Sequence, residues 1–163
     1  MKKCNTELMK DLKVIQELIS AARQKQHHNS TVSYTEKEKA SVVCLFDYEA
    51  SEREFAQLQA EERHIKKLLA VSNATTKVEG YDITIAEALV LLAQLSLNKK
   101  FLSRLATKER LVRESSEYRK EVEFTKVCYD LEKAQADLAK LNKDIAKLQM
   151  ALDRTNLTNL IEV

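Results

Sequence analysis

The basic residues between Lys99 and Arg113 are the side chains whose type and spacing best suit ligand binding. Lys100, Arg104 and Lys108 recur every four residues, so on one helix they would share a face. Ammonium and guanidinium groups on one face could hold an anion or the phosphates of a nucleic-acid backbone. The alternative, which we favour, is that this stripe packs against an acidic face at Glu52–Glu62 of a neighbouring helix.

The histidines do not form a pattern that predicts a metal site. Glu61 and His64 have the Glu-x-x-His spacing of di-iron helical bundles, but such a site needs a second copy, which the sequence lacks. His27 and His28 are adjacent and would diverge by about 100° on a helix. No nucleophile, base and orienting group can be placed together either. We therefore predict no catalytic residue, no metal and no cofactor, and a protein that is not an enzyme.

Composition disfavours nucleic acid and membranes as partners. The 27 basic and 25 acidic side chains leave a net charge of only +2. No apolar run approaches the roughly 18–20 residues that span a bilayer. The chain has an odd number of cysteines without close spacing, Cys4, Cys44 and Cys128, which suits a reducing compartment. None of them has a His or Cys at metal-ligand spacing. We expect a cytoplasmic protein in which Cys44 and Cys128 pack as small apolar residues.

The chain contains one glycine and no proline, which predicts a few long helices joined by short connections. Either Asp82 or Thr84 can cap the start of the third helix, and Glu87 follows Thr84 at capping-box spacing. Glu62 falls on the apolar seam of the second helix, where it is either a buried polar residue or, as we prefer, a residue at the edge of the seam. Apolar periodicity and capping residues predict four helices, at about 6–26, 36–72, 82–115 and 127–155.

The last helix carries the clearest apolar pattern. Its leucines and isoleucine alternate at three- and four-residue steps, which is the seam of a helix that buries one narrow stripe against another helix. Charged residues fill the other positions. We predict that this seam mediates self-association through Leu131, Leu138, Leu141, Ile145, Leu148 and Leu152.

Two short segments alternate polar and apolar residues as strands do, at 31–35 and 119–126. The two halves of the chain, residues 1–79 and 80–163, also resemble each other. A shift of 80 residues places Glu7, Leu12 and Ile15 on equivalent positions at Glu87, Leu92 and Leu95. Each half therefore reads as helix, strand and helix, and we expect the two strands to pair as an antiparallel ribbon.

Two stretches, one on each side of the boundary between the halves, resemble a known family. The sequences Asn73–Val78 and Thr84–Leu89, extended by Val122–Phe124 and Asp153–Thr158, are similar to the bacterial septicolysin-like family. The resemblance covers residues 72–163 and implies a small helical protein of unknown function. Members of the family often have a tryptophan where Leu157 stands. The family name implies a further candidate function, that of a cytolysin, which ranks third after the two given below.

The sequence thus predicts an all-α fold in a single domain spanning residues 1–163. We expect a four-helix bundle of two tandem helical hairpins with coiled-coil-like seams, together with the small ribbon. The second and third predicted helices are longer than the first can cover, which predicts a homo-oligomer, a dimer or higher. The predicted function is a self-associating scaffold or interaction protein with an unknown protein partner. Binding of an anion or a nucleic-acid backbone is the alternative.

Overall fold

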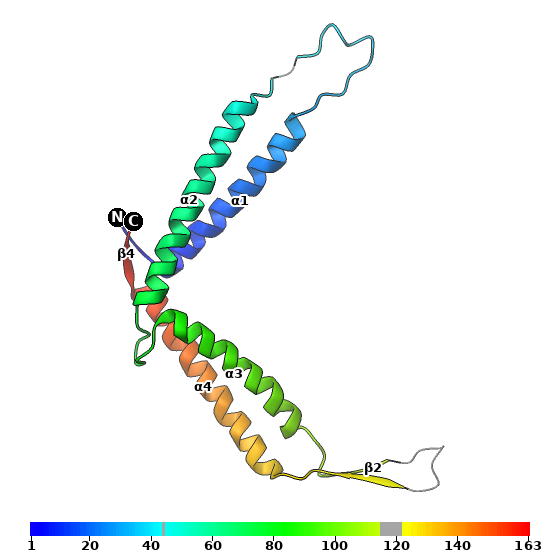
Figure 1. Ribbon diagram of the computed structural model, residues 1–163, viewed down its shortest axis with the longest axis vertical. Coiled ribbons are helices and arrows are strands. Elements are labelled where there is room, and N and C mark those ends of the chain that lie inside the picture. Colours follow the sequence, from blue (N-terminus) through cyan, green and yellow to red (C-terminus); the bar gives the residue numbers. More distant parts are fainter. Residues whose placement is uncertain (44, 115–121) are drawn as a thin grey trace. The chain divides into compact units, whose positions relative to one another are not determined.

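The computed structural model describes residues 1–43, 45–114 and 122–163 of the chain (Figure 1). The described part is mostly helical, with two small antiparallel sheets of two strands each. The prediction of a mostly helical protein with four long helices is confirmed. In chain order the elements are β1 (Lys2–Cys4), α1 (Asn5–Asn29), α2 (Tyr48–Thr75), α3 (Ile85–Ala106), β2 (Leu111–Glu114), β3 (Glu123–Lys126), α4 (Leu131–Thr158) and β4 (Leu160–Glu162).

The chain divides into two compact units. Unit 1 comprises Met1–Thr75 together with Asn156–Val163, and unit 2 comprises Thr76–Thr155. Each unit contains one helical hairpin, α1 with α2 and α3 with α4 (Figure 1). Packing of the two hairpins into one bundle remains a prediction.

Unit 1 is held together by apolar side chains between α1 and α2. Leu8, Ile15 and Ile65 are buried at the centre of this interface. Leu8 and Ile15 are seven residues apart, so they lie on one face of α1 and meet α2 along a single stripe. The half-buried side chains around them are Leu12, Ile19, Leu58, Leu68, Leu69 and Ile161.

The two ends of the chain pair with each other in unit 1. β1 and β4 are antiparallel, with Lys3 opposite Ile161 and Cys4 opposite Leu160. The backbone N–H of Val163 also donates to the Met1 carbonyl at 2.9 Å. Because Cys4 leads directly into α1, this pairing anchors the first turn of the helix beside the last residues of the chain.

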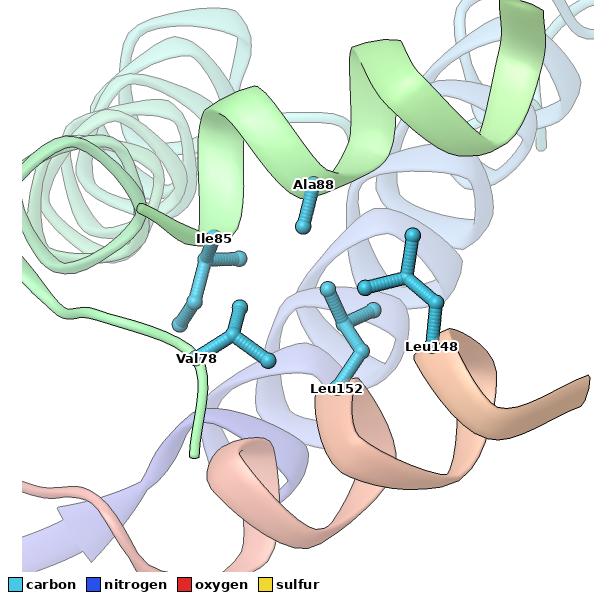
Figure 2. Close-up of a cluster of buried hydrophobic side chains, with 5 residues drawn as sticks. All are labelled: Val78, Ile85, Ala88, Leu148 and Leu152. Atoms are coloured by element: carbon cyan, nitrogen blue, oxygen red, sulfur yellow. The ribbon is translucent and has the colours of Figure 1, made fainter. Parts of the chain in front are cut away.

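Unit 2 has its own core, built from both helices and the segment before α3. Val78, Ile85 and Ala88 face Leu148 and Leu152 of α4, and all five are buried (Figure 2). The connector from α2 turns at Gly80, whose positive φ of 79° favours glycine over residues with a side chain. Two backbone bonds close the connector: Val78 N–H to the Ile83 carbonyl and Ile85 N–H to the Thr76 carbonyl, both at 2.9 Å.

An antiparallel ribbon forms, but it is not the predicted one between residues 31–35 and 119–126, of which residues 119–121 lie outside the described part. β3 pairs with β2, with Arg113 opposite Phe124, whereas residues 31–35 form no strand. Pairing of segments that are close in sequence costs less entropy than pairing across about half the chain. At Thr35 the backbone N–H and the hydroxyl both donate to Glu38, so local turn bonds replace strand pairing there.

Two predicted helix bounds were also wrong. α2 begins at Tyr48 rather than near residue 36, because the Asp47 carboxylate accepts the Ala50 N–H at 2.9 Å and caps the helix there. α3 ends at Ala106 rather than near residue 115, and Leu111–Glu114 forms β2 instead. The hydroxyl of Thr107 donates to the Ser103 carbonyl at 2.9 Å, which satisfies one carbonyl of the last turn.

Candidate interaction surface

Local hydrogen bonds fix the start of α3. The Thr84 hydroxyl accepts the Glu87 backbone N–H at 3.2 Å, and Glu87 Oε2 accepts the Thr84 backbone N–H at 2.7 Å and its hydroxyl at 2.9 Å. Of the two caps that the sequence allows, the structure has Thr84, and its capping box with Glu87 is confirmed. The bond from the Thr84 backbone, followed by the bond from its hydroxyl, lowers the pKa of Glu87 below its ordinary value. Glu87 therefore carries its negative charge at neutral pH.

One face of α3 is buried in unit 2. Ile85, Ala88 and Ala106 are buried, and Leu92 and Leu95 pack against the core as half-buried side chains. Steps of three, four and seven residues keep these side chains on one side of the helix. Because this inner face packs against the core of unit 2, the residues on the opposite side of α3 point away from that core.

The opposite face of α3 is also apolar, and it is exposed. Val90, Leu97 and Phe101 are seven and four residues apart and are 58 %, 66 % and 65 % exposed, with Ala93 exposed between them. We call Val90, Ala93, Leu97 and Phe101 the outer stripe. Single exposed apolar residues are common on proteins, but a helix that is apolar on two opposite sides is usually buried on both. The outer stripe is therefore a candidate contact surface.

The two ends of α3 carry opposite charges. Glu87 is exposed in the first turn, whereas Lys100 and Arg104 are exposed in the last two turns. Within the described part of unit 2, neither Lys100 nor Arg104 has an acidic partner. Of the three candidate anion-binding residues, Lys108 lies past the end of the helix, because α3 ends at Ala106. The structure thus places two of the three cations, and not all three, on one helical face.

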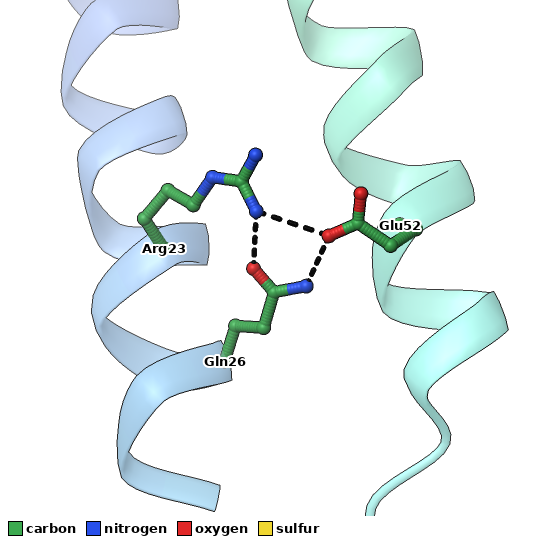
Figure 3. Close-up of polar contacts among 3 residues, drawn as sticks. All are labelled: Arg23, Gln26 and Glu52. Atoms are coloured by element: carbon green, nitrogen blue, oxygen red, sulfur yellow. Dashed lines mark hydrogen bonds and ion pairs between the residues drawn. The ribbon is translucent and has the colours of Figure 1, made fainter. Parts of the chain in front are cut away.

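The acidic face of α2 is occupied by partners on its own hairpin. Glu52 accepts from Arg23 at 3.0 Å and from the Gln26 amide, as Figure 3 shows. The bond from Gln26 and then the bond from Arg23 lower the pKa of Glu52. The Arg23 guanidinium also lies over the Phe55 ring, 3.4 Å from its centroid, a cation–π contact.

Glu62 behaves as a residue at the edge of the interface. Its side chain is 20 % exposed, and it pairs with Lys66 at 2.7 Å and with Gln16 at 3.2 Å. The bond from Lys66, with that from Gln16, lowers the pKa of Glu62. Both Glu52 and Glu62 are therefore paired within unit 1.

The seam predicted for self-association is largely covered inside unit 2. Ile145, Leu148 and Leu152 are buried, and Leu148 and Leu152 contact the α3 side of the core. The remaining seam residues, Leu131, Leu138 and Leu141, are half-buried. A seam that already packs within its own hairpin offers little apolar area to a second molecule.

Residues considered for metal or thiol chemistry lie apart. In the described ranges, no group of three His, Cys, Asp or Glu side chains lies close enough to hold a metal ion. Cys128 is exposed, so the prediction that it packs as a small apolar residue was wrong, whereas Cys44 lies outside the described residues and Cys4 is buried. Nor does any helix of the described residues have the length and apolar character to cross a membrane.

Sequence reasoning missed a buried polar network in unit 1. Asn5, which is 1 % exposed, donates to Asn156 at 3.0 Å and accepts from the Ser72 hydroxyl at 2.9 Å. The Asn159 amide donates to the same hydroxyl at 3.0 Å. These residues come from the start of α1, the last turns of α2 and the end of the chain. Their separation in sequence hides the network, and each asparagine by itself suggests only a helix boundary.

Sequence reasoning also missed a cavity of about 620 Å³ at the open end of the unit 1 hairpin. It lies between the end of α1, the start of α2 and the segment that joins them. Its lining mixes apolar side chains such as Val32 and Phe46 with Lys25, His28 and Glu54. No regular spacing in the sequence marks this combination.

Comparisons with known proteins identify the fold. No family model matches the sequence, and the search of curated proteins found no relative. A crystal structure of a functionally unknown conserved protein from Corynebacterium diphtheriae is similar, with a TM-score of 0.66 and 14 % identity. The match covers 99 % of this chain and 100 % of that chain. This likeness shows a shared fold. At such low identity it carries no information on activity.

Proposed function

We propose that the protein is a non-enzymatic helical scaffold that associates with copies of itself through the outer stripe of α3. The observation that carries this proposal is the exposure of Val90, Leu97 and Phe101 on the side of α3 that faces away from its core. The α4 seam is the weaker candidate, because its buried members already pack inside unit 2. The resemblance to the septicolysin-like family and a cytoplasmic location belong to the same proposal.

The size of the stripe sets the expected affinity. Complete burial of a valine, leucine or phenylalanine side chain contributes about 1.5–3 kcal/mol, so the exposed parts of three such residues on each of two copies contribute roughly 6–10 kcal/mol. Loss of translational and rotational freedom opposes association by about 4–15 kcal/mol. The stripe alone therefore supports only a weak dimer, and polar contacts at its margins must add to it.

The proposal is tested by Leu97→Glu, which places a charge at the centre of the outer stripe. We expect the variant to sediment as a monomer at tens of micromolar, where the unmodified protein sediments as an oligomer. The matched control is Leu18→Glu, since Leu18 is also an exposed leucine, at 47 %, but lies on α1. An oligomer that persists in Leu97→Glu, or that is lost equally in Leu18→Glu, would contradict the proposal.

Anion binding is the second candidate function, favoured by the exposure of Lys100 and Arg104 without acidic partners in the described part of unit 2. It predicts salt-sensitive retention on heparin. Lys100→Glu combined with Arg104→Glu should elute at lower salt. Retention that does not change in the double variant would remove this candidate.

A further inference from the structure

We infer that two copies pair with their α3 helices antiparallel, so that Glu87 of one copy lies opposite Arg104 of the other. The inference rests on the proposed function and specifies its geometry. It identifies the occupant of the outer stripe as the same stripe on a second copy, related to it by a twofold axis.

Charge along α3 favours the antiparallel orientation. The exposed face runs from Glu87, through the apolar Val90, Leu97 and Phe101, to Arg104 at the far end. Antiparallel pairing brings each acidic end against a basic end. Parallel pairing would instead place Glu87 beside Glu87 and Arg104 beside Arg104, and like charges at close range are unfavourable. The dipoles of two antiparallel helices also oppose each other favourably.

The order of large and small side chains fits the same register. With Glu87 opposite Arg104, Val90 lies opposite Phe101 and Gln94 lies opposite Leu97. Ala93 then lies one position from the partner's Leu97, so a small residue on each helix leaves room for a large one on the other. Such pairing lets two helices approach closely and interdigitate. The axis passes between residues 95 and 96, near the middle of α3 (Ile85–Ala106).

The leading helix of unit 1 does not offer an equivalent surface. Under the 80-residue shift, the positions of Val90 and Leu97 in α3 correspond to Lys10 and Glu17 in α1, both exposed. Charges at these positions interrupt the apolar face of α1. Of the two leading helices, α1 and α3, α3 therefore carries the self-complementary pattern and α1 does not.

Disulfide trapping tests both the partner and the orientation. In a background of Cys44→Ser and Cys128→Ser, one preparation carries Val90→Cys and a second carries Phe101→Cys. We expect mild oxidation of the mixture to give at least about tenfold more covalent dimer than oxidation of either preparation alone, because disulfides require Cα atoms within about 7 Å. In the inferred register, two copies of residue 90 are separated by eleven residues along the helix axis, or about 16 Å.

The outcomes separate the inference from the proposed function. A covalent dimer from Val90→Cys alone would indicate parallel helices and overturn the inference. An oligomer in sedimentation that gives no cross-link in the mixture would also overturn it, while leaving self-association intact. A protein that is monomeric at tens of micromolar would remove both.

A charge variant tests the same register independently, by its effect on dimerisation, in a protein that keeps its three native cysteines. Arg104→Glu should weaken dimerisation about tenfold, because residue 104 would then face Glu87 of the second copy. The control is Lys99→Glu, at an exposed position on the other side of α3. Equal effects of the two variants would contradict the inferred register.

Discussion

The leading helices of the two hairpins, α1 and α3, are alike on their inner faces and different on their outer faces. Inside, Leu12 and Ile15 of α1 correspond to Leu92 and Leu95 of α3, and each pair packs in or against the core of its own unit. Outside, the equivalents of the apolar outer stripe are Lys10, Lys13, Glu17 and Ala21. The inner face is what a hairpin needs to fold. The outer faces of the two helices differ, and the proposed self-association uses only that of α3.

The hairpins also differ in how they bury polar groups. In unit 1, Ser72 joins a network of asparagine side chains. Its equivalent in unit 2 under a shift of 83 residues is Thr155, whose hydroxyl accepts the Glu79 backbone N–H at 3.0 Å and donates to the Ala151 carbonyl at 2.8 Å. Both residues are 5 % exposed. The hydroxyl at this position therefore bonds to asparagine side chains in unit 1 and to the backbone of the connector before α3 in unit 2.

The largest expected effect comes from the cores. Leu148→Ala should lower the free energy of unfolding by about 2–5 kcal/mol, because Leu148 is 2 % exposed and truncation leaves a cavity. Leu97→Ala should change the stability of the monomer by less than about 0.5 kcal/mol. Urea unfolding at a protein concentration that favours the monomer measures both. A large loss of stability in Leu97→Ala would mean that the outer stripe is part of the fold.

A second core variant tests whether each unit loses stability independently of the other. Leu8→Ala, at a fully buried position of unit 1, should reduce amide hydrogen-exchange protection mainly in α1 and α2. Leu148→Ala should do so mainly in α3 and α4. Uniform loss of protection in both variants would show that the two units unfold as one.

The buried network gives the next largest effect. Asn5→Ala removes a partner from both Ser72 and Asn156, so it should cost about 1–3 kcal/mol in the free energy of unfolding. Thr155→Val should cost about 1 kcal/mol, since it removes hydroxyl bonds but keeps the shape of the side chain. Thermal unfolding measures both. A smaller loss in Asn5→Ala than in Thr155→Val would contradict this ranking.

Loss of the helix cap should have a moderate effect. Thr84→Ala removes the side chain that caps α3 and should cost about 1 kcal/mol. Thr84→Ser keeps the hydroxyl and should restore most of the stability. Equal losses in the two variants would show that the methyl group of Thr84, rather than its hydroxyl, provides the stabilisation.

The smallest effect is a dependence of stability on pH. The Thr84 backbone N–H, followed by its hydroxyl, lowers the pKa of Glu87, and the Cys4 backbone N–H lowers that of Glu7, each from an ordinary value of 4.5. A lowered folded-state pKa stabilises the protein above the unfolded-state pKa, and this stability is lost as the pH falls through the folded-state pKa. Glu87→Gln should therefore reduce the loss of stability below about pH 4.5. Unfolding curves that fall equally steeply in Glu87→Gln and the unmodified protein would contradict this.

The sequence was informative about local features and uninformative about which surfaces meet. Helix number follows from neighbouring residues and was predicted correctly, and the cap at Thr84 was one of two that the sequence allowed. The pairing of β2 with β3 depends on competition between segments far apart in the chain, which periodicity does not rank. The outer stripe was overlooked because α3 is apolar on two sides, and only burial shows which side the core uses.

The α4 seam illustrates the same difficulty. Its regular spacing at Leu138, Ile145 and Leu152 predicts a partner helix, but spacing does not reveal whether that partner is in the same chain. The structure places Leu152 against Ile85 and Val78 of its own unit. A pattern in the sequence therefore predicts burial more reliably than it predicts the partner.

The most direct measurement of the central claim is the molar mass of the unmodified protein across a concentration series, by light scattering. One chain has a mass of 18.7 kDa. If the outer stripe of α3 binds a second copy, the mass should rise towards twice this value at tens of micromolar and fall back on dilution. A mass that stays at 18.7 kDa throughout the series would contradict the account.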